Sequence, residues 1–273
     1  MISDKKEKKP AIYYVRVVWD VFRKSMWGWG PFVVLLIIWQ LVQSFSGIDP
    51  RLMPNLWEIV QQFGVIIRNG MLLEYMLRTL KMLVTSGIVS IVVGYAIGLL
   101  LGLSKVASAY ASPVLRYFNA LPGIALTPLF LLWFGFNEKT ILAVVMYTFL
   151  FPVIFNVMNG IQMVPRVYTN AILTMGGSRW TVIKDVLFHG SLASLMTGIR
   201  TGFGYGWRAI IGAEILAGTG GLGYMIFQAR SSGTIARIVA GMIVIGVVWT
   251  IMDKALLQPL EKSTIERWAL VVR

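Results

Sequence analysis

The sequence contains no cysteine, and His189 is its only histidine among 273 residues. Without cysteine the chain has no disulfide, no thiol nucleophile and no thiolate ligand for a metal ion. One histidine cannot build a metal site alone. With one histidine and no cysteine, the chain has few residues from which a nucleophilic centre based on these two residue types could be built. These absences argue against an enzyme.

Charge is also scarce. Charged residues make up 14% of the chain and hydrophobic residues 57%, whereas soluble domains have about 25% and about 45–50%. The apolar residues form long blocks, which indicates an integral membrane protein. The formal net charge of +13 is spread over the tails and the loops between these blocks. That distribution does not favour a nucleic-acid partner.

No phosphate-binding loop is present in the sequence. A P-loop needs G-x-x-x-x-G-K-[ST] after a strand, and the segment from Gly135 to Thr140 lacks the second glycine. The segment Gly218 to Gly223 spells G-x-G-x-x-G, but it follows an apolar helix, so we expect an external turn there. We therefore expect no nucleotide and no other cofactor in this chain.

Six segments are apolar over the roughly 20 residues that a helix needs to cross a bilayer. The third contains Pro122, Gly123 and Pro128 and is expected to be kinked or partly re-entrant. We expect one all-α integral membrane domain, residues 1–273, with an N-terminal tail over residues 1–26 and neither a linker nor an internal repeat. The expected spans are Trp27–Phe45, Thr79–Leu103, Pro113–Phe134, Thr140–Met158, Leu192–Leu216 and Ile235–Leu257.

Orientation follows from the lysines and arginines of the loops. Most of them fall on one side if the N-terminus is cytoplasmic, as the positive-inside rule requires. The charged lead before the first span, with no A-x-A-like cleavage site after it, favours a retained span over a cleaved signal peptide. Both termini and the loop 163–189 are thus expected in the cytoplasm, and a short external helix is expected between Ser46 and Arg78.

The loop between the fourth and fifth spans has the pattern of two short amphipathic helices. In the first, Val164, Val167, Ala171, Ile172 and Met175 recur at helical spacing. Gly176-Gly177 is expected to end that helix through a left-handed turn, and Ser178 to cap the second helix. The apolar side of the second helix is Trp180, Ile183 and Leu187. Such a pair lies on a membrane surface or fills a groove on a partner.

Two spans carry glycines in steps of four. Small residues let membrane helices approach closely, so these glycines predict close helix contacts, either within one subunit or between two; glycine is also simply common in membrane helices. The glycines are Gly94, Gly98 and Gly102 in the second span and Gly198, Gly202 and Gly206 in the fifth.

Ionisable residues within the fifth span are the pathway candidates, because a charge in a bilayer needs a partner or water. Arg208 and Glu214 are six residues apart, about 120° around a helix, and do not suit one another as partners. A pathway-facing Arg208 favours an anionic cargo, and a buried ion pair is the alternative. Trp207 either lines the pathway or packs away from it. Arg200 is expected to reach the membrane edge, where Asp253 and Lys254 are expected to be interface charges.

The segment Asn170 to Trp180, N-A-I-L-T-M-G-G-S-R-W, resembles the E-A-A-x-x-x-G loop of bacterial ABC importer permeases. More narrowly, it is similar to the nitrate/sulfonate/taurine (bicarbonate) subfamily. The similarity extends through Leu121–Gly135, Thr197–Trp207 and Ala213–Tyr224. The chain departs from the pattern with Asn170 for the glutamate, Ile172 for the second alanine, Phe188-His189 for Leu-Pro and Ala120 for a proline.

The resemblance implies a type I permease in a bacterial cytoplasmic (inner) membrane, paired with a second copy in a homodimer. Two ATP-binding subunits would hold ATP and Mg and dock on the loop, and an extracytoplasmic substrate-binding protein would deliver a sulfonate such as taurine, nitrate or a similar small anion. Alternatives are a neutral heterocycle (a pyrimidine thiamine precursor or riboflavin) as cargo, or a stand-alone secondary carrier, for which the sequence lacks the usual inverted repeat. The implied coupling residues are Asn170, Ala171, Gly176, Gly177, Ser178, Arg179 and Trp180.

Overall fold

The computed structural model describes residues 30–49 and 52–268, and within these ranges all regular structure is helical. The expected N-terminal tail, residues 1–26, lies outside the described residues. The chain divides into two compact units, residues 1–61 and 62–273.

The helices follow one another with short connections. After an apolar helix, Gly30–Phe45, come α2 (Leu56–Arg68), α3 (Met71–Leu103), α4 (Lys105–Ala120), the 3₁₀ turn η1 (Gly123–Leu126), α5 (Thr127–Phe134), α6 (Glu138–Met163), α7 (Arg166–Thr174), α8 (Arg179–Thr181), the π-helical η2 (Val182–Leu187), α9 (Phe188–Ala217), α10 (Leu222–Ser231), α11 (Ile235–Met252), the π-helical η3 (Asp253–Leu257) and α12 (Gln258–Trp268).

In the first unit, the helix Gly30–Phe45 is tied to the loop that follows it. The Trp39 indole Nε1 donates to the Pro54 carbonyl at 3.0 Å, and the Leu56 amide donates to Gln40 Oε1 at 3.2 Å. Asn55 caps α2, because its Oδ1 accepts from the Glu58 amide at 2.8 Å.

The described helices fit a membrane protein. Four of them are long and apolar enough to cross a bilayer: Met71–Leu103, Glu138–Met163, Arg179–Ala217 and Ile235–Thr264. A fifth crossing would be the pair Lys105–Ala120 and Gly123–Phe134, which is bent by 80°. The expected all-α membrane fold is confirmed, and the expected break in the third span falls at Pro122.

One expectation needs correction. The third span begins at Lys105 rather than Pro113, and Pro113 lies inside α4. The expected turn after α9 is present over Gly218–Gly221, and the short helix α10 (Leu222–Ser231), which was not expected, follows it. The signal for α10 was present in the buried Leu222, Met225 and Ala229, which recur at helical spacing.

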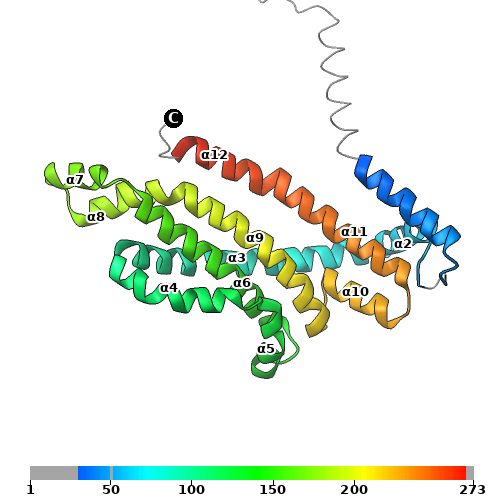
Figure 1. Cartoon of the computed structure of the whole chain (residues 1–273). Coiled ribbons are helices and arrows are strands. Elements are labelled where there is room, and N and C mark those ends of the chain that lie inside the picture. Colours follow the sequence, from blue (N-terminus) through cyan, green and yellow to red (C-terminus); the bar gives the residue numbers. More distant parts are fainter. Residues whose placement is uncertain (1–29, 50–51, 269–273) are drawn as a thin grey trace, which may run out of the picture. The chain divides into compact units, whose positions relative to one another are not determined.

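Helix α6 packs between α3 and α9 in the second unit (Figure 1). The glycine steps face α6 from both sides: a Cβ on Gly98 would lie 2.8 Å from Val157, and a Cβ on Gly202 would lie 2.6 Å from the Phe149 ring. Those helix contacts therefore lie within one chain. Small residues at these positions let three apolar helices approach without voids.

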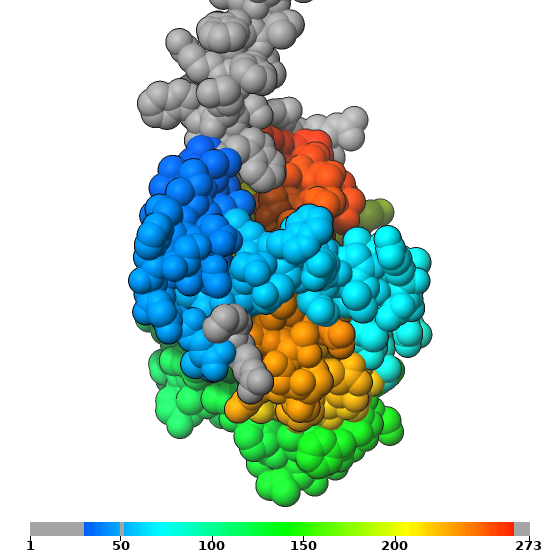
Figure 2. Space-filling model, turned by 90° about the vertical axis from the view of Figure 1, so that its right-hand side faces the viewer, coloured from blue at the N-terminus to red at the C-terminus, as the bar shows by residue number. Residues whose placement is uncertain are grey.

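The loop helices α7 and α8 lie at one end of the α3–α6–α9 group, and α10 lies at the other (Figure 1). Figure 2 faces the second of these ends, where α10 and the start of α11 in orange lie beside α3 in cyan. We call the α7–α8 end the loop end.

Candidate functional site

The loop at the loop end is a helical hairpin whose turn is built by two glycines. Gly176 has a φ of 83°, which an L-residue rarely adopts. The Gly177 amide donates to the Ile172 carbonyl at 2.9 Å, and the Gly176 amide to the Leu173 carbonyl at 3.1 Å. This pair of bonds is the Schellman ending of a helix. A Cβ on Gly177 would meet Ile172 Cγ2 at 2.5 Å, so both glycines are needed.

The second half of the hairpin begins at Ser178, whose Oγ accepts from the Thr181 amide at 3.2 Å. Ser178 thus caps α8, as the sequence predicts. The helix that starts there does not end within the loop, however. It continues through the π-helical η2 into α9, which gives an unbroken helical run from Arg179 to Ala217. The second half of the hairpin and the span therefore share one continuous helix.

The hairpin exposes several large apolar side chains. Met175 is 85% exposed and Trp180 70% exposed, and Val167, Tyr168 and Leu173 are also exposed. Of the other predicted apolar positions, Val164 is buried, Ile172 is half-buried and Ala171 is exposed. Asn170 and Arg179 are exposed as well. Apolar side chains gathered in this way mark a surface that contacts a partner or lipid.

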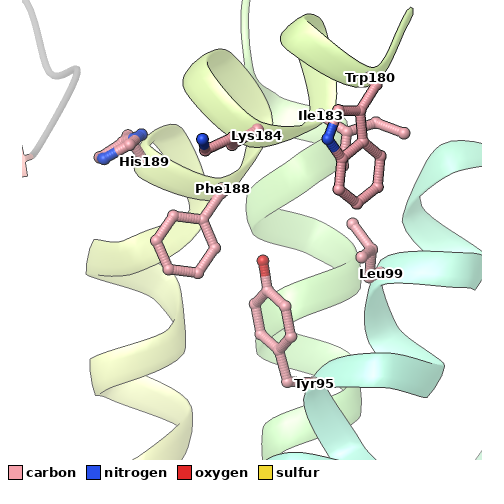
Figure 3. A pocket seen from close by; sticks show the side chains of 7 residues that line it. All are labelled: Tyr95, Leu99, Trp180, Ile183, Lys184, Phe188 and His189. Atoms are coloured by element: carbon pink, nitrogen blue, oxygen red, sulfur yellow. The ribbon is translucent and has the colours of Figure 1, made fainter.

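A hollow of about 410 Å³ lies beside the hairpin (Figure 3). Tyr95 and Leu99 of α3 face Trp180 and Phe188 across it, and Lys184 lies at its edge (Figure 3). The Tyr95 and Phe188 rings meet edge to face with centroids 5.9 Å apart. The end of α3 and the hairpin thus form one largely aromatic surface.

Glu214, a predicted pathway candidate, lies in the interior at the other end of α9. Its side chain is fully buried. The Thr79 hydroxyl donates to its carboxylate at 2.8 Å, and the Gly223 amide donates to the other oxygen at 2.8 Å. Thr79 in turn accepts from the Leu222 amide at 2.9 Å. Glu214 therefore fastens α3 and the start of α10 to α9.

Trp207 and Arg208 are neighbours in α9 that point to different surroundings. Trp207 is 4% exposed and stacks on Trp249 of α11 with ring centroids 6.1 Å apart. Arg208 is exposed, and no hydrogen bond or ion pair joins its guanidinium to another described residue. Of the three pathway candidates, only Arg208 lies on an open face.

Arg200 lies nearer the loop end, and its guanidinium forms ion pairs with two carboxylates. Its guanidinium donates to both oxygens of Asp253, at 2.8 and 3.0 Å, and to Glu261 at 2.6 Å. Thr197 also donates to Glu261 at 3.2 Å. Asp253, expected as an interface charge, thus has a defined partner. This cluster joins α9 to η3 and α12, and its members are too far apart in sequence for a local pattern to pair them.

The arrangement of apolar spans around α6, with one exposed hairpin between two of them, is that of a multi-pass membrane protein. The chain belongs to the family of binding-protein-dependent transport system inner membrane components, whose family profile matches residues 90–254. The resemblance stated from the sequence is thereby confirmed, and the family role is transport rather than enzyme catalysis.

Individual relatives agree with this family. The chain is 26% identical to the taurine transport system permease protein TauC of Escherichia coli, over 87% of this chain and 88% of that protein. It is 28% identical to the nitrate import permease protein NrtB of Synechocystis, over 81% and 82%. The fold matches a chain of the MetNI methionine ABC transporter with a TM-score of 0.59 at 19% identity, over 71% and 96%.

Proposed function

We propose that the chain is the transmembrane permease subunit of an ATP-driven importer for a small anion that carries a sulfonate or nitrate group. Family membership and relatives named for taurine and nitrate transport support this function. The observation that supports an anionic cargo is Arg208, an exposed cation inside a span that no ion pair joins to another residue in the part of the chain that the structure describes. A charge inside a membrane span is retained where it meets water, substrate or another chain.

The hairpin supplies the link to an energy source. Its exposed apolar side chains, with Met175 and Trp180 as the largest, suit a groove on a soluble partner. We propose that the partner is an ATP-binding subunit that holds ATP and Mg. With both termini and the hairpin in the cytoplasm, two such subunits would drive two copies of this chain, and a binding protein would deliver the solute from outside.

Reconstitution into liposomes tests this function. We expect no uptake of radiolabelled taurine or nitrate by the chain alone, and uptake once the ATP-binding subunit, the binding protein and ATP are added. The matched control replaces ATP by ADP with all the proteins present. Uptake by the chain alone, without ATP, would show a stand-alone carrier and overturn the proposal.

A further inference from the structure

A second arginine shares the two properties that single out Arg208. Arg116 lies inside α4, the first half of the broken span. Its side chain is exposed, and no hydrogen bond or ion pair joins it to another described residue. The other arginine in the middle of a span, Arg200, is held by two carboxylates. Among the described residues, Arg116 and Arg208 therefore have no carboxylate partner of the kind that usually accompanies a cation within a membrane span.

Helix α4 has a polar face and an apolar face. Arg116 shares the polar face with Ser108, Ser112 and Asn119, which are spaced by three and four residues. The opposite face carries exposed apolar side chains: Val106, Tyr110, Val114 and Tyr117. Lipid accommodates the second face but not the first. The face with Arg116 is thus turned toward water or a polar partner.

The position of Arg116 along the helix group follows from the contacts of α4 with α6 and of η1 with α9. At the start of α4, the side-chain Nε2 of Gln162 in α6 donates to Ser108 Oγ at 3.2 Å. Beyond Arg116, the Tyr147 hydroxyl of α6 donates to the Phe118 carbonyl. η1 follows and meets α9, where a Cβ on Gly212 would run into Ile124.

That contact between η1 and α9 serves as a reference point for the positions of the two arginines. Arg208 lies one helical turn before Gly212 along α9, on the side of the loop end. Arg116 lies on the same side of η1, about one turn before the end of α4 at Ala120. Both cations therefore lie between the η1–α9 contact and the loop end.

We propose that Arg116 is a second anion-binding residue of the pathway, on the same side of the η1–α9 contact as Arg208. This inference rests on the proposed anion import. Two successive weak sites let an ion enter and leave, whereas one deep cation would retain it. The solute is recognised at Arg116 by its sulfonate or nitrate oxygens, which match the donors of a guanidinium.

The absence of cysteine suits a labelling test, because an introduced cysteine is the only thiol of this chain and its labelling can be read on the separated chain. The variants are Arg116→Cys, Arg208→Cys and, on the apolar face of α4, Val114→Cys. Each is produced with the whole transporter, and the membranes are treated with a sulfonate-bearing thiosulfonate reagent. We expect Arg116→Cys and Arg208→Cys to react at least about tenfold faster than Val114→Cys, because the thiolate forms only where water reaches the thiol. Added taurine or nitrate should slow both reactions.

The results distinguish a failure of the role proposed for Arg116 from a failure of the anion pathway at Arg208. If Arg208→Cys reacts and Arg116→Cys reacts no faster than Val114→Cys, the role of Arg116 is wrong and the anion pathway stands. If neither arginine position reacts, the pathway at Arg208 fails as well. Uptake gives an independent readout. Arg116→Gln should raise the KM for the anion several-fold, and Arg116→Lys should restore it. An equal KM for the unchanged chain and both variants would overturn the inference.

Discussion

The hairpin contains residues that its backbone requires and, beside them, a large side chain that is left exposed. Gly176, Gly177 and Ser178 are explained by the backbone itself, because they close one helix and cap the next. Trp180 is not explained in this way, since 70% of its side chain is exposed. A large aromatic side chain left open beside a turn that is fixed by glycine is a typical anchor for a partner.

Replacement of Trp180 separates docking from folding. Trp180→Ala should leave the thermal stability of the chain nearly unchanged, because exposed substitutions rarely alter it by more than about 0.5 kcal/mol. Loss of an interface anchor costs about 2 kcal/mol or more, which is roughly a 30-fold weaker affinity. Co-purification of the ATP-binding subunit in detergent measures the effect.

Trp133→Ala is the matched control, because Trp133 is similarly exposed at 64% but lies in α5. We expect it to retain the ATP-binding subunit. Equal retention by both variants would remove Trp180 from the docking surface.

At the scale of elements, the packing of α9 on α6 depends on particular glycines. Gly202→Ala should destabilise the chain by about 1–3 kcal/mol, because its Cβ would lie 2.6 Å from the buried ring of Phe149. Gly204→Ala on the same helix places its Cβ at an ordinary 3.6 Å from Trp249 and should be tolerated. Unfolding of the two purified variants by heat compares them, and equal stability would contradict the contact.

The Arg200 cluster links α9 to the C-terminal helix. Arg200→Met leaves Asp253 and Glu261 without their cation. Removal of one partner from a cluster of paired charges usually destabilises the contact between the helices that carry them. We expect faster amide hydrogen exchange in α12 and η3 and unchanged exchange in α3. Asp253→Asn and Glu261→Gln, added to Arg200→Met, should return exchange toward the original rate. No change in α12 on loss of Arg200 would show that the cluster does not hold this helix.

Sequence patterns predict the spans well, because a run of apolar residues is a local property. They also predict the break at Pro122 and the hairpin turn at Gly176, since proline and glycine act on their own backbone. Pairings between helices have no such signal. Thr79 and Glu214 meet across 135 residues, and Thr79 is one hydroxyl in an apolar run. From sequence alone, Glu214, Trp207 and Arg208 are therefore all pathway candidates. In the fold, Glu214 and Trp207 are buried and only Arg208 is exposed.

At the scale of the whole molecule, the hairpin and α9 are arranged as a lever. The hairpin continues without a break into α9, which carries Arg208 and contacts α6, η1 and α12. A force on α8 therefore reaches the open face of the span through one helix. The central claim is that this force comes from an ATP-binding subunit on the cytoplasmic side.

The most direct test is the accessibility of one engineered thiol at the hairpin tip, where Met175 is 85% exposed. Met175→Cys should react with a membrane-impermeant maleimide in inside-out vesicles and not in right-side-out vesicles. Its reaction should be strongly reduced when the ATP-binding subunit is assembled on the chain. Labelling in right-side-out vesicles, or full labelling in the assembled transporter, would contradict the account.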